Sequence, residues 1–214
     1  MRPAYPHTLV RARQVILALC ISLSLSAQVT DRDLFDAYLR EDMTVWQAYV
    51  DSIYNLQSTT CNHTLAYEYG YCGYIVAEAK KSGDEALMAQ AKQYVAHFKS
   101  SISNLQSQLP AGHYEMYMSA VLVYELRLHE SIHPIKAMSL AKEATKLAPS
   151  DPIVLSYFGT CLFYAPEPFG SKADALTWFQ KAEPLFQAPQ YEYSWLREAN
   201  QMYINQCLEK LKKQ

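Results

Sequence analysis

Glycine is scarce in this 214-residue chain, which holds six glycines in total. The chain has no glycine-rich phosphate loop and no Gly-x-Ser-x-Gly nucleophile elbow. The first motif uses backbone N–H groups to cradle phosphates, and the second exposes a nucleophilic serine on a sharp turn. The sequence therefore gives no sign of phosphate-loop nucleotide binding or of catalysis by such a serine.

Long apolar runs and basic clusters are also missing after the first 27 residues. A membrane-spanning helix needs roughly 20 apolar residues, and no later segment has that character. The formal charge of the chain is −2, and loss of residues 1–27 would remove three arginines and no acidic residue, giving −5. Because nucleic-acid affinity depends on neutralising phosphates with Lys and Arg, we expect no nucleic-acid partner and no transmembrane segment.

The first 27 residues have the features of a secretory signal peptide. Arginines precede an apolar run from Val15 to Leu25, and small residues follow up to Ala27. This order of charge, apolar run and small residues is typical of a cleaved leader. The sequence predicts a signal peptide over residues 1–27, cleavage near Ala27, and one mature domain over residues 28–214 that is secreted or periplasmic.

The cysteines leave several alternatives open. Cys20 could carry a lipid, although Leu19 stands where a lipoprotein signal has a small residue. The mature chain keeps four cysteines, and an oxidising compartment permits disulfides between them: Cys61, Cys72, Cys161 and Cys207. Their spacing matches no zinc ribbon and no redox Cys-x-x-Cys motif. A Cys161–Cys207 disulfide is the favoured pairing, and buried free thiols are an equal alternative.

Apolar residues recur at three- and four-residue spacing, with no sustained alternation of the kind that strands show. Prolines and turn residues gather at the apparent breaks. We therefore predict an all-α chain. The expected helices cover residues 33–55 with a break near 42, 62–81, 84–106, 114–128, 134–148 and 152–165. A further helix carries Ala175, Phe179 and Ala182 and weakens at Pro184, and the last covers 191–212.

Small residues at fixed spacing indicate how these helices pack. The first set is three alanines followed by a proline: Ala137, Ala141, Ala144 and Pro149. The next expected helix carries large and small residues in the order large, large, small, large: Leu155, Phe158, Gly159 and Leu162. Part of the first set then returns downstream as Ala175, Phe179 and Ala182. This pattern resembles the tetratricopeptide repeat. The resemblance implies antiparallel helix pairs stacked as a short solenoid, with a C-terminal capping helix; an irregular helical bundle is the alternative.

Members of that family bind partners along a concave groove, so the resemblance implies a non-catalytic module with a protein or peptide partner. The family's groove-lining positions correspond here to ten residues of mixed polarity: Ser119, Leu122, Leu126, His129, Glu130, Ile153, Ser156, Thr160, Phe163 and Tyr164.

The end of the predicted signal peptide carries a second resemblance. The form Leu25-Ser26-Ala27-Gln28 is similar to secretion signals of Bacteroidota-like Gram-negative bacteria.

The segment from His129 to His133 reads His-Glu-x-x-His, which on a helix could bind zinc and hydrolyse peptides. Pro134 directly follows and disfavours helical geometry at His133. Arg127 also places a charge where such peptidases carry an uncharged residue. We therefore predict no catalytic residue, no metal ligand and no cofactor, and keep a zinc metallopeptidase as an alternative.

Two further interpretations stay open. Tyr67, Tyr69, Tyr71 and Tyr74 could line a ligand surface, although tyrosine in helix pairs more often serves packing. The chain could also be a structural subunit of a cell-envelope assembly, which would require a large apolar surface patch.

Overall fold

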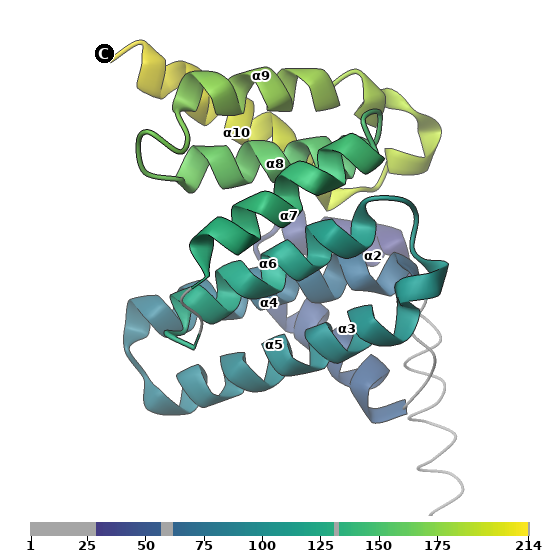
Figure 1. The fold of residues 1–214 in the computed structure, drawn as a ribbon. Coiled ribbons are helices and arrows are strands. Elements are labelled where there is room, and N and C mark those ends of the chain that lie inside the picture. The colour runs from purple at the N-terminus through teal and green to yellow at the C-terminus, as the bar shows by residue number, and fades with distance from the viewer. Residues whose placement is uncertain (1–28, 57–61, 131–132, 214) are drawn as a thin grey trace, which may run out of the picture.

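The computed structural model describes residues 29–56, 62–130 and 133–213. Within these ranges the chain forms nine α-helices and no strand (Figure 1). The predicted signal peptide, Cys61 and the centre of the His-Glu-x-x-His segment lie outside the described residues. The helices are α2 Asp31–Leu39, α3 Met43–Leu56, α4 Asn62–Ser82, α5 Glu85–Leu105, α6 His113–Arg127, α7 Pro134–Leu147, α8 Pro152–Tyr164, α9 Lys172–Ala182 and α10 Trp195–Leu211.

Helix ends follow local signals in the sequence. The carboxylate of Asp84 accepts hydrogen bonds from the first backbone N–H groups of α5, and Asp151 does the same for α8. Pro134 and Pro152 begin α7 and α8 at the position where a missing N–H costs nothing. The predicted start of the last helix at Tyr191 is wrong, because Pro189–Tyr191 forms a separate 3-10 turn and α10 begins at Trp195.

Consecutive helices pack as neighbouring pairs, α4 with α5, α6 with α7, and α8 with α9. Ala141 and Ala144 of α7 are fully buried, as are Ala175 and Phe179 of α9. A Cβ added to Gly159 of α8 would lie 2.8 Å from the ring of Phe179, so glycine is what allows this close approach. The small residues of the sequence pattern therefore lie where paired helices meet.

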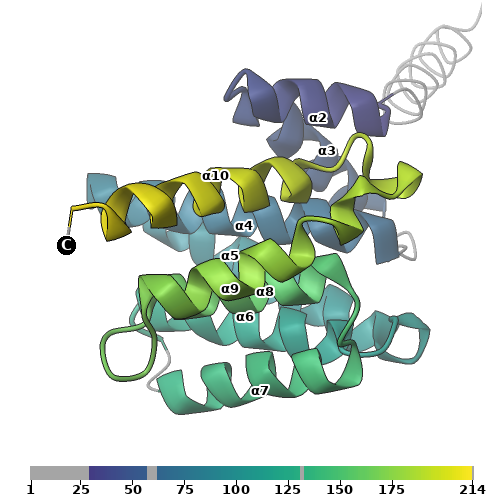
Figure 2. The same cartoon turned by 90° about the horizontal axis from the view of Figure 1, so that it is seen from above.

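Helix α10 connects the two ends of the domain. It packs against α9, α8 and α2, and Figure 2 shows it running in front of α4, between α2 and α9. The ring centroid of its first residue, Trp195, lies 5.4 Å from that of Trp46, 5.6 Å from that of Tyr38 and 5.8 Å from that of Tyr69. Aromatic pairs at these distances stabilise beyond the area that they bury. Residues from α2, α3 and α4 thus hold the N-terminus of α10.

Among the side chains that the structure describes, one acidic side chain is fully buried in the core, Glu68 of α4. Burial raises the pKa of Glu68 to about 7, and the hydroxyl groups of Ser101 and Tyr54 lower it only in part. Neither carboxylate oxygen has a well-aligned hydrogen bond within the described part of the chain. The loss of water around the Glu68 anion is therefore the largest influence on the pKa of this side chain.

None of the described helices is long and apolar enough to cross a membrane.

Candidate functional site

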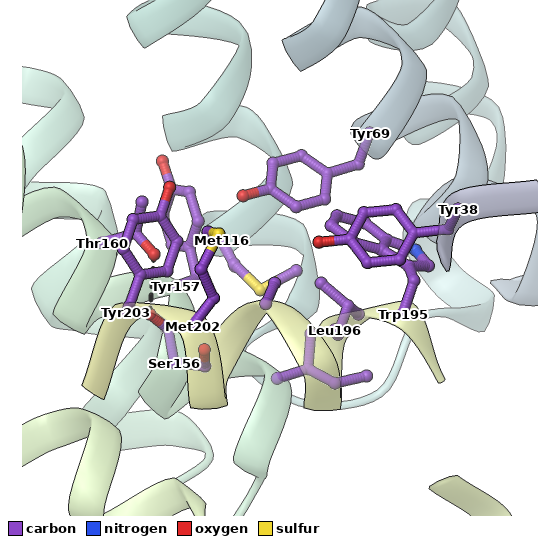
Figure 3. A pocket seen from close by; sticks show the side chains of 12 residues that line it. Tyr38, Tyr69, Met116, Ser156, Tyr157, Thr160, Trp195, Leu196, Met202 and Tyr203 are labelled. Carbon is purple, nitrogen blue, oxygen red and sulfur yellow. Dashed lines mark hydrogen bonds between the residues drawn. The ribbon is translucent and has the colours of Figure 1, made fainter. Parts of the chain in front are cut away.

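A small cavity remains where α10 covers the other helices, and we call it the aromatic pocket (Figure 3). Its volume is about 130 Å³. Five helices contribute its lining: Tyr38 of α2, Tyr69 of α4, Met116 of α6, Ile153, Ser156, Tyr157 and Thr160 of α8, and Trp195, Leu196, Ala199, Met202 and Tyr203 of α10.

Helical periodicity brings these side chains to one place. On α10 the lining residues recur every three or four positions, as Leu196, Ala199 and Met202 show, so they share one face of the helix. The lining residues of α8 recur in the same way. Met202 is 41% exposed, which places it where the pocket meets solvent.

The aromatic pocket is uncharged but holds several hydroxyl groups. The Tyr157 hydroxyl donates to Ser119 Oγ at 2.9 Å, and Thr160 Oγ1 donates to the Ser156 carbonyl at 3.1 Å. In Figure 3 the side chains of Tyr38 and Tyr69 enter from the same side of the view, with both hydroxyl groups directed toward the other lining residues. Burial raises the pKa of both phenols, so they remain neutral and can donate hydrogen bonds.

A larger cavity of about 540 Å³ adjoins the aromatic pocket, and we call it the tyrosine cleft. The two share Ile153, Trp195 and Leu196. The other residues that line the cleft come from α2, α4, α6 and the segment before α10: Asp31, Ala66, Tyr67, His113, Tyr117, Pro189, Gln190, Tyr191, Glu192, Tyr193 and Ser194. Each cavity has five tyrosine or tryptophan side chains in its lining, and these come from segments far apart in sequence.

Three of the predicted groove residues, Ile153, Ser156 and Thr160, line the aromatic pocket. Other groove predictions need correction. Ser119, Leu122 and Phe163 are buried and line neither cavity. Ser156 is buried as well, so it faces the aromatic pocket and not an open groove. Ser119 Oγ donates to the Ala137 carbonyl at 2.7 Å and so links α6 to α7.

The remaining predicted groove residues are exposed but are not part of either cavity. Leu126 lies near the end of α6, and His129 Nε2 lies 2.8 Å from Lys80 Nζ. Glu130 forms an ion pair of 3.1 Å with Lys92. Tyr164 has a hydroxyl contact of 3.3 Å with Tyr203, a pocket residue. The ten predicted positions are therefore not brought together on one surface.

The two histidines of the His-Glu-x-x-His segment do not share a helix. Helix α6 ends at Arg127, His129 has a positive φ of 61°, and His133 precedes the first residue of α7. A zinc site of this type needs both histidines on one helical face. Over the residues that the structure describes, no three His, Cys, Asp or Glu side chains are grouped so as to hold a metal ion.

The predicted Cys161–Cys207 disulfide is wrong, because both cysteines are free thiols. Cys161 belongs to α8 and Cys207 to α10. Burial raises the pKa of the Cys161 thiol to about 11 and also raises that of Cys207. Since the thiolate is the reactive form, neither side chain is suited to nucleophilic chemistry.

Sequence reasoning missed most of the pocket. Of the tyrosine run, Tyr71 is buried, as expected for packing, whereas Tyr69 lines the aromatic pocket and Tyr67, although buried, lines the tyrosine cleft. Met116 and Trp195 had no local signal, because their helices carry apolar residues on more than one face. Their role depends on where α10 lies.

No protein-family model, curated protein or solved structure matches this chain.

Proposed function

We propose that this protein is a non-catalytic binding module that acts outside the cytoplasm and is built from tetratricopeptide-like helix pairs. It holds a peptide or protein partner through one apolar side chain of the partner, which enters the aromatic pocket. The observation that carries the proposal is the open, uncharged pocket beneath α10. Binding sites of this kind combine an apolar lining with a few polar groups that fix orientation.

The volume of the pocket limits its occupant. A dry protein cavity of roughly 150 Å³ holds one benzene molecule, and the aromatic pocket measures about 130 Å³. One leucine, isoleucine or methionine side chain is of this size, whereas a drug-sized ligand needs a pocket of roughly 300–1,000 Å³ and would not be enclosed. Burial of such a side chain stabilises a complex by roughly 1.5–3 kcal/mol.

The helix-pair packing supports the architectural part of the proposal. Ala137, Ala141 and Ala144 are buried along one face of α7, and Gly159 allows the ring of Phe179 to approach α8. Small residues at paired-helix contacts followed by a terminal proline are what the tetratricopeptide pattern requires. Export rests on the signal-peptide pattern of residues 1–27.

Filling the pocket with Ala199→Phe is expected to weaken partner binding at least tenfold, because the added ring occupies the space of the partner's side chain. Peptides enriched from a random display library on the wild-type protein would be measured by fluorescence polarisation. Gln201→Phe is the matched control, since Gln201 is exposed on the same helix and does not line the pocket. Peptides that bind the Ala199→Phe variant as well as wild type, or a library without enrichment, would refute the proposal.

A further inference from the structure

Two lysine side chains lie against one aromatic ring near the aromatic pocket. Lys172 Nζ is 3.9 Å from the centroid of the Phe163 ring, and Lys210 Nζ is 5.0 Å from the same centroid. Lys172 is the first residue of α9, and Lys210 belongs to the last turn of α10. The start of α9 and the end of α10 lie at the same end of the domain (Figure 2). Two helices thus bring these ammonium groups, which we call the lysine pair, to one ring.

Within the described residues, neither lysine of the pair forms an ion pair with a carboxylate, since the ion pairs there join other side chains. Lys172 Nζ donates a hydrogen bond to the Phe163 carbonyl. An ammonium group has three N–H donors, so Lys172 can still bind a ligand. Burial and the neighbouring charge of Lys210 lower the pKa of Lys172. The two positive charges repel each other, and an anion bound to both would offset this repulsion.

The lysine pair continues a stripe of α10 that begins in the aromatic pocket. Ala199 and Tyr203 line the pocket, and Lys210 follows on the same helical face, seven residues after Tyr203. The ring centroid of Tyr203 lies 5.3 Å from that of Phe163, on which the lysine pair rests. Seven residues of helix rise by roughly 10 Å, a distance that about three residues of an extended peptide span. A short segment with one side chain in the pocket can therefore reach the lysine pair.

We propose that the lysine pair binds a carboxylate side chain of the same partner whose apolar side chain enters the aromatic pocket. This inference rests on the proposed function and specifies the partner's chemistry. Each ammonium group donates a charge-assisted hydrogen bond to the carboxylate. Because the Phe163 ring replaces water on one side of each ammonium group, the carboxylate has less water to displace than at a fully solvated lysine. The partner therefore carries an acidic residue about three positions from its apolar residue.

Charge-neutralising variants test the carboxylate with peptides enriched on the wild-type protein. Lys172→Gln and Lys210→Gln are each expected to weaken binding about threefold, and the double variant about tenfold, as for partly exposed ion pairs. Lys212→Gln removes the same charge and is the control without effect, because a residue two positions beyond Lys210 lies on another side of the helix. Replacing the acidic residue of the peptide with its amide should weaken binding to the wild-type protein about tenfold and leave binding to the double variant unchanged.

A second measurement does not depend on any peptide. Sodium propionate should shift the side-chain Cε–Hε resonances of Lys172 and Lys210, assigned with the two glutamine variants, more strongly than sodium chloride does at the same ionic strength. The resonance of Lys212 should respond equally to both salts. Equal shifts at the lysine pair, or a stronger response to inorganic phosphate at pH 6 than to propionate, would overturn the carboxylate.

The peptide measurements separate this inference from the proposed function. Peptides that lose affinity with Ala199→Phe but bind the lysine variants as tightly as wild type would overturn the carboxylate and leave the proposed function standing. Peptides that bind Ala199→Phe as tightly as wild type would overturn the proposed function.

Discussion

Replacing Glu68 with glutamine is expected to stabilise the protein by ~3 kcal/mol at pH 8 and by almost nothing at pH 4. The pKa of Glu68 is about 7 in the folded chain, against an ordinary value of 4.5. Below pH 4.5 the carboxyl is protonated in both states, so the folded state bears no penalty. As the pH rises to about 7, the unfolded chain loses this proton first, and folding must then bury an anion or retain a proton. At about 1.4 kcal/mol for each pKa unit, the cost reaches ~3 kcal/mol.

Thermal unfolding of wild type and variant between pH 4 and pH 8 measures this effect. The difference in melting temperature should grow to roughly 6–12 °C at the upper end for a domain of this size. Glu143→Gln provides the control, because Glu143 is exposed on α7 and forms a surface ion pair with Lys146 of 2.7 Å. Such pairs contribute at most about 1 kcal/mol. Equal pH dependence of wild type and Glu68→Gln would contradict the assignment.

Replacing Gly70 with alanine is expected to destabilise the protein by about 2 kcal/mol, although alanine is the better helix former. An added Cβ would lie 2.5 Å from the ring of Trp46 and 2.8 Å from that of Trp195. Both contacts are to rigid indoles, and Trp46 is held by its Nε1 donating to the Leu34 carbonyl at 2.7 Å. The rings must separate, which loosens the N-terminus of α10. The melting temperature should fall by roughly 4–8 °C, with a changed near-ultraviolet circular dichroism spectrum.

Gly73→Ala is the matched control for Gly70→Ala in the same helix. Its Cβ would approach only Tyr124, with the hydroxyl at 3.1 Å. A shift of a few tenths of an ångström relieves this contact, and the helix gains up to about 1 kcal/mol in propensity. The variant should therefore be neutral or slightly more stable than wild type. If the melting temperature of Gly70→Ala equals or exceeds that of Gly73→Ala, the two tryptophans are not packed as described.

The variants Glu68→Gln and Gly70→Ala are expected to differ in their effect on partner binding. Glu68 lies among α3, α4 and α5, away from both cavities, so Glu68→Gln should alter stability without altering partner binding. Trp195 lines both cavities, so Gly70→Ala should also weaken the binding of enriched peptides. Comparing the variants below their melting temperatures separates loss of fold from loss of the pocket.

The sequence by itself determined the helices and most of their ends. Asp84, Pro134 and Asp151 act on backbone groups within three or four residues, so their effect can be predicted without knowing the rest of the fold. The buried alanines of α7 follow equally from local spacing, since residues three and four apart share a helical face. The pattern also predicted that the helices pack as neighbouring pairs.

Only the tertiary structure decided where the cavities lie. The contact between Trp46 and Trp195 joins residues 149 positions apart, and it depends on how every intervening helix pair is oriented. Small differences in packing accumulate along the chain, so no local pattern specifies this contact. The position of α10 covers Phe163, whose ring centroid lies 5.3 Å from that of Tyr203. It also leaves Ile153, Ser156, Thr160 and Tyr69 beside the aromatic pocket.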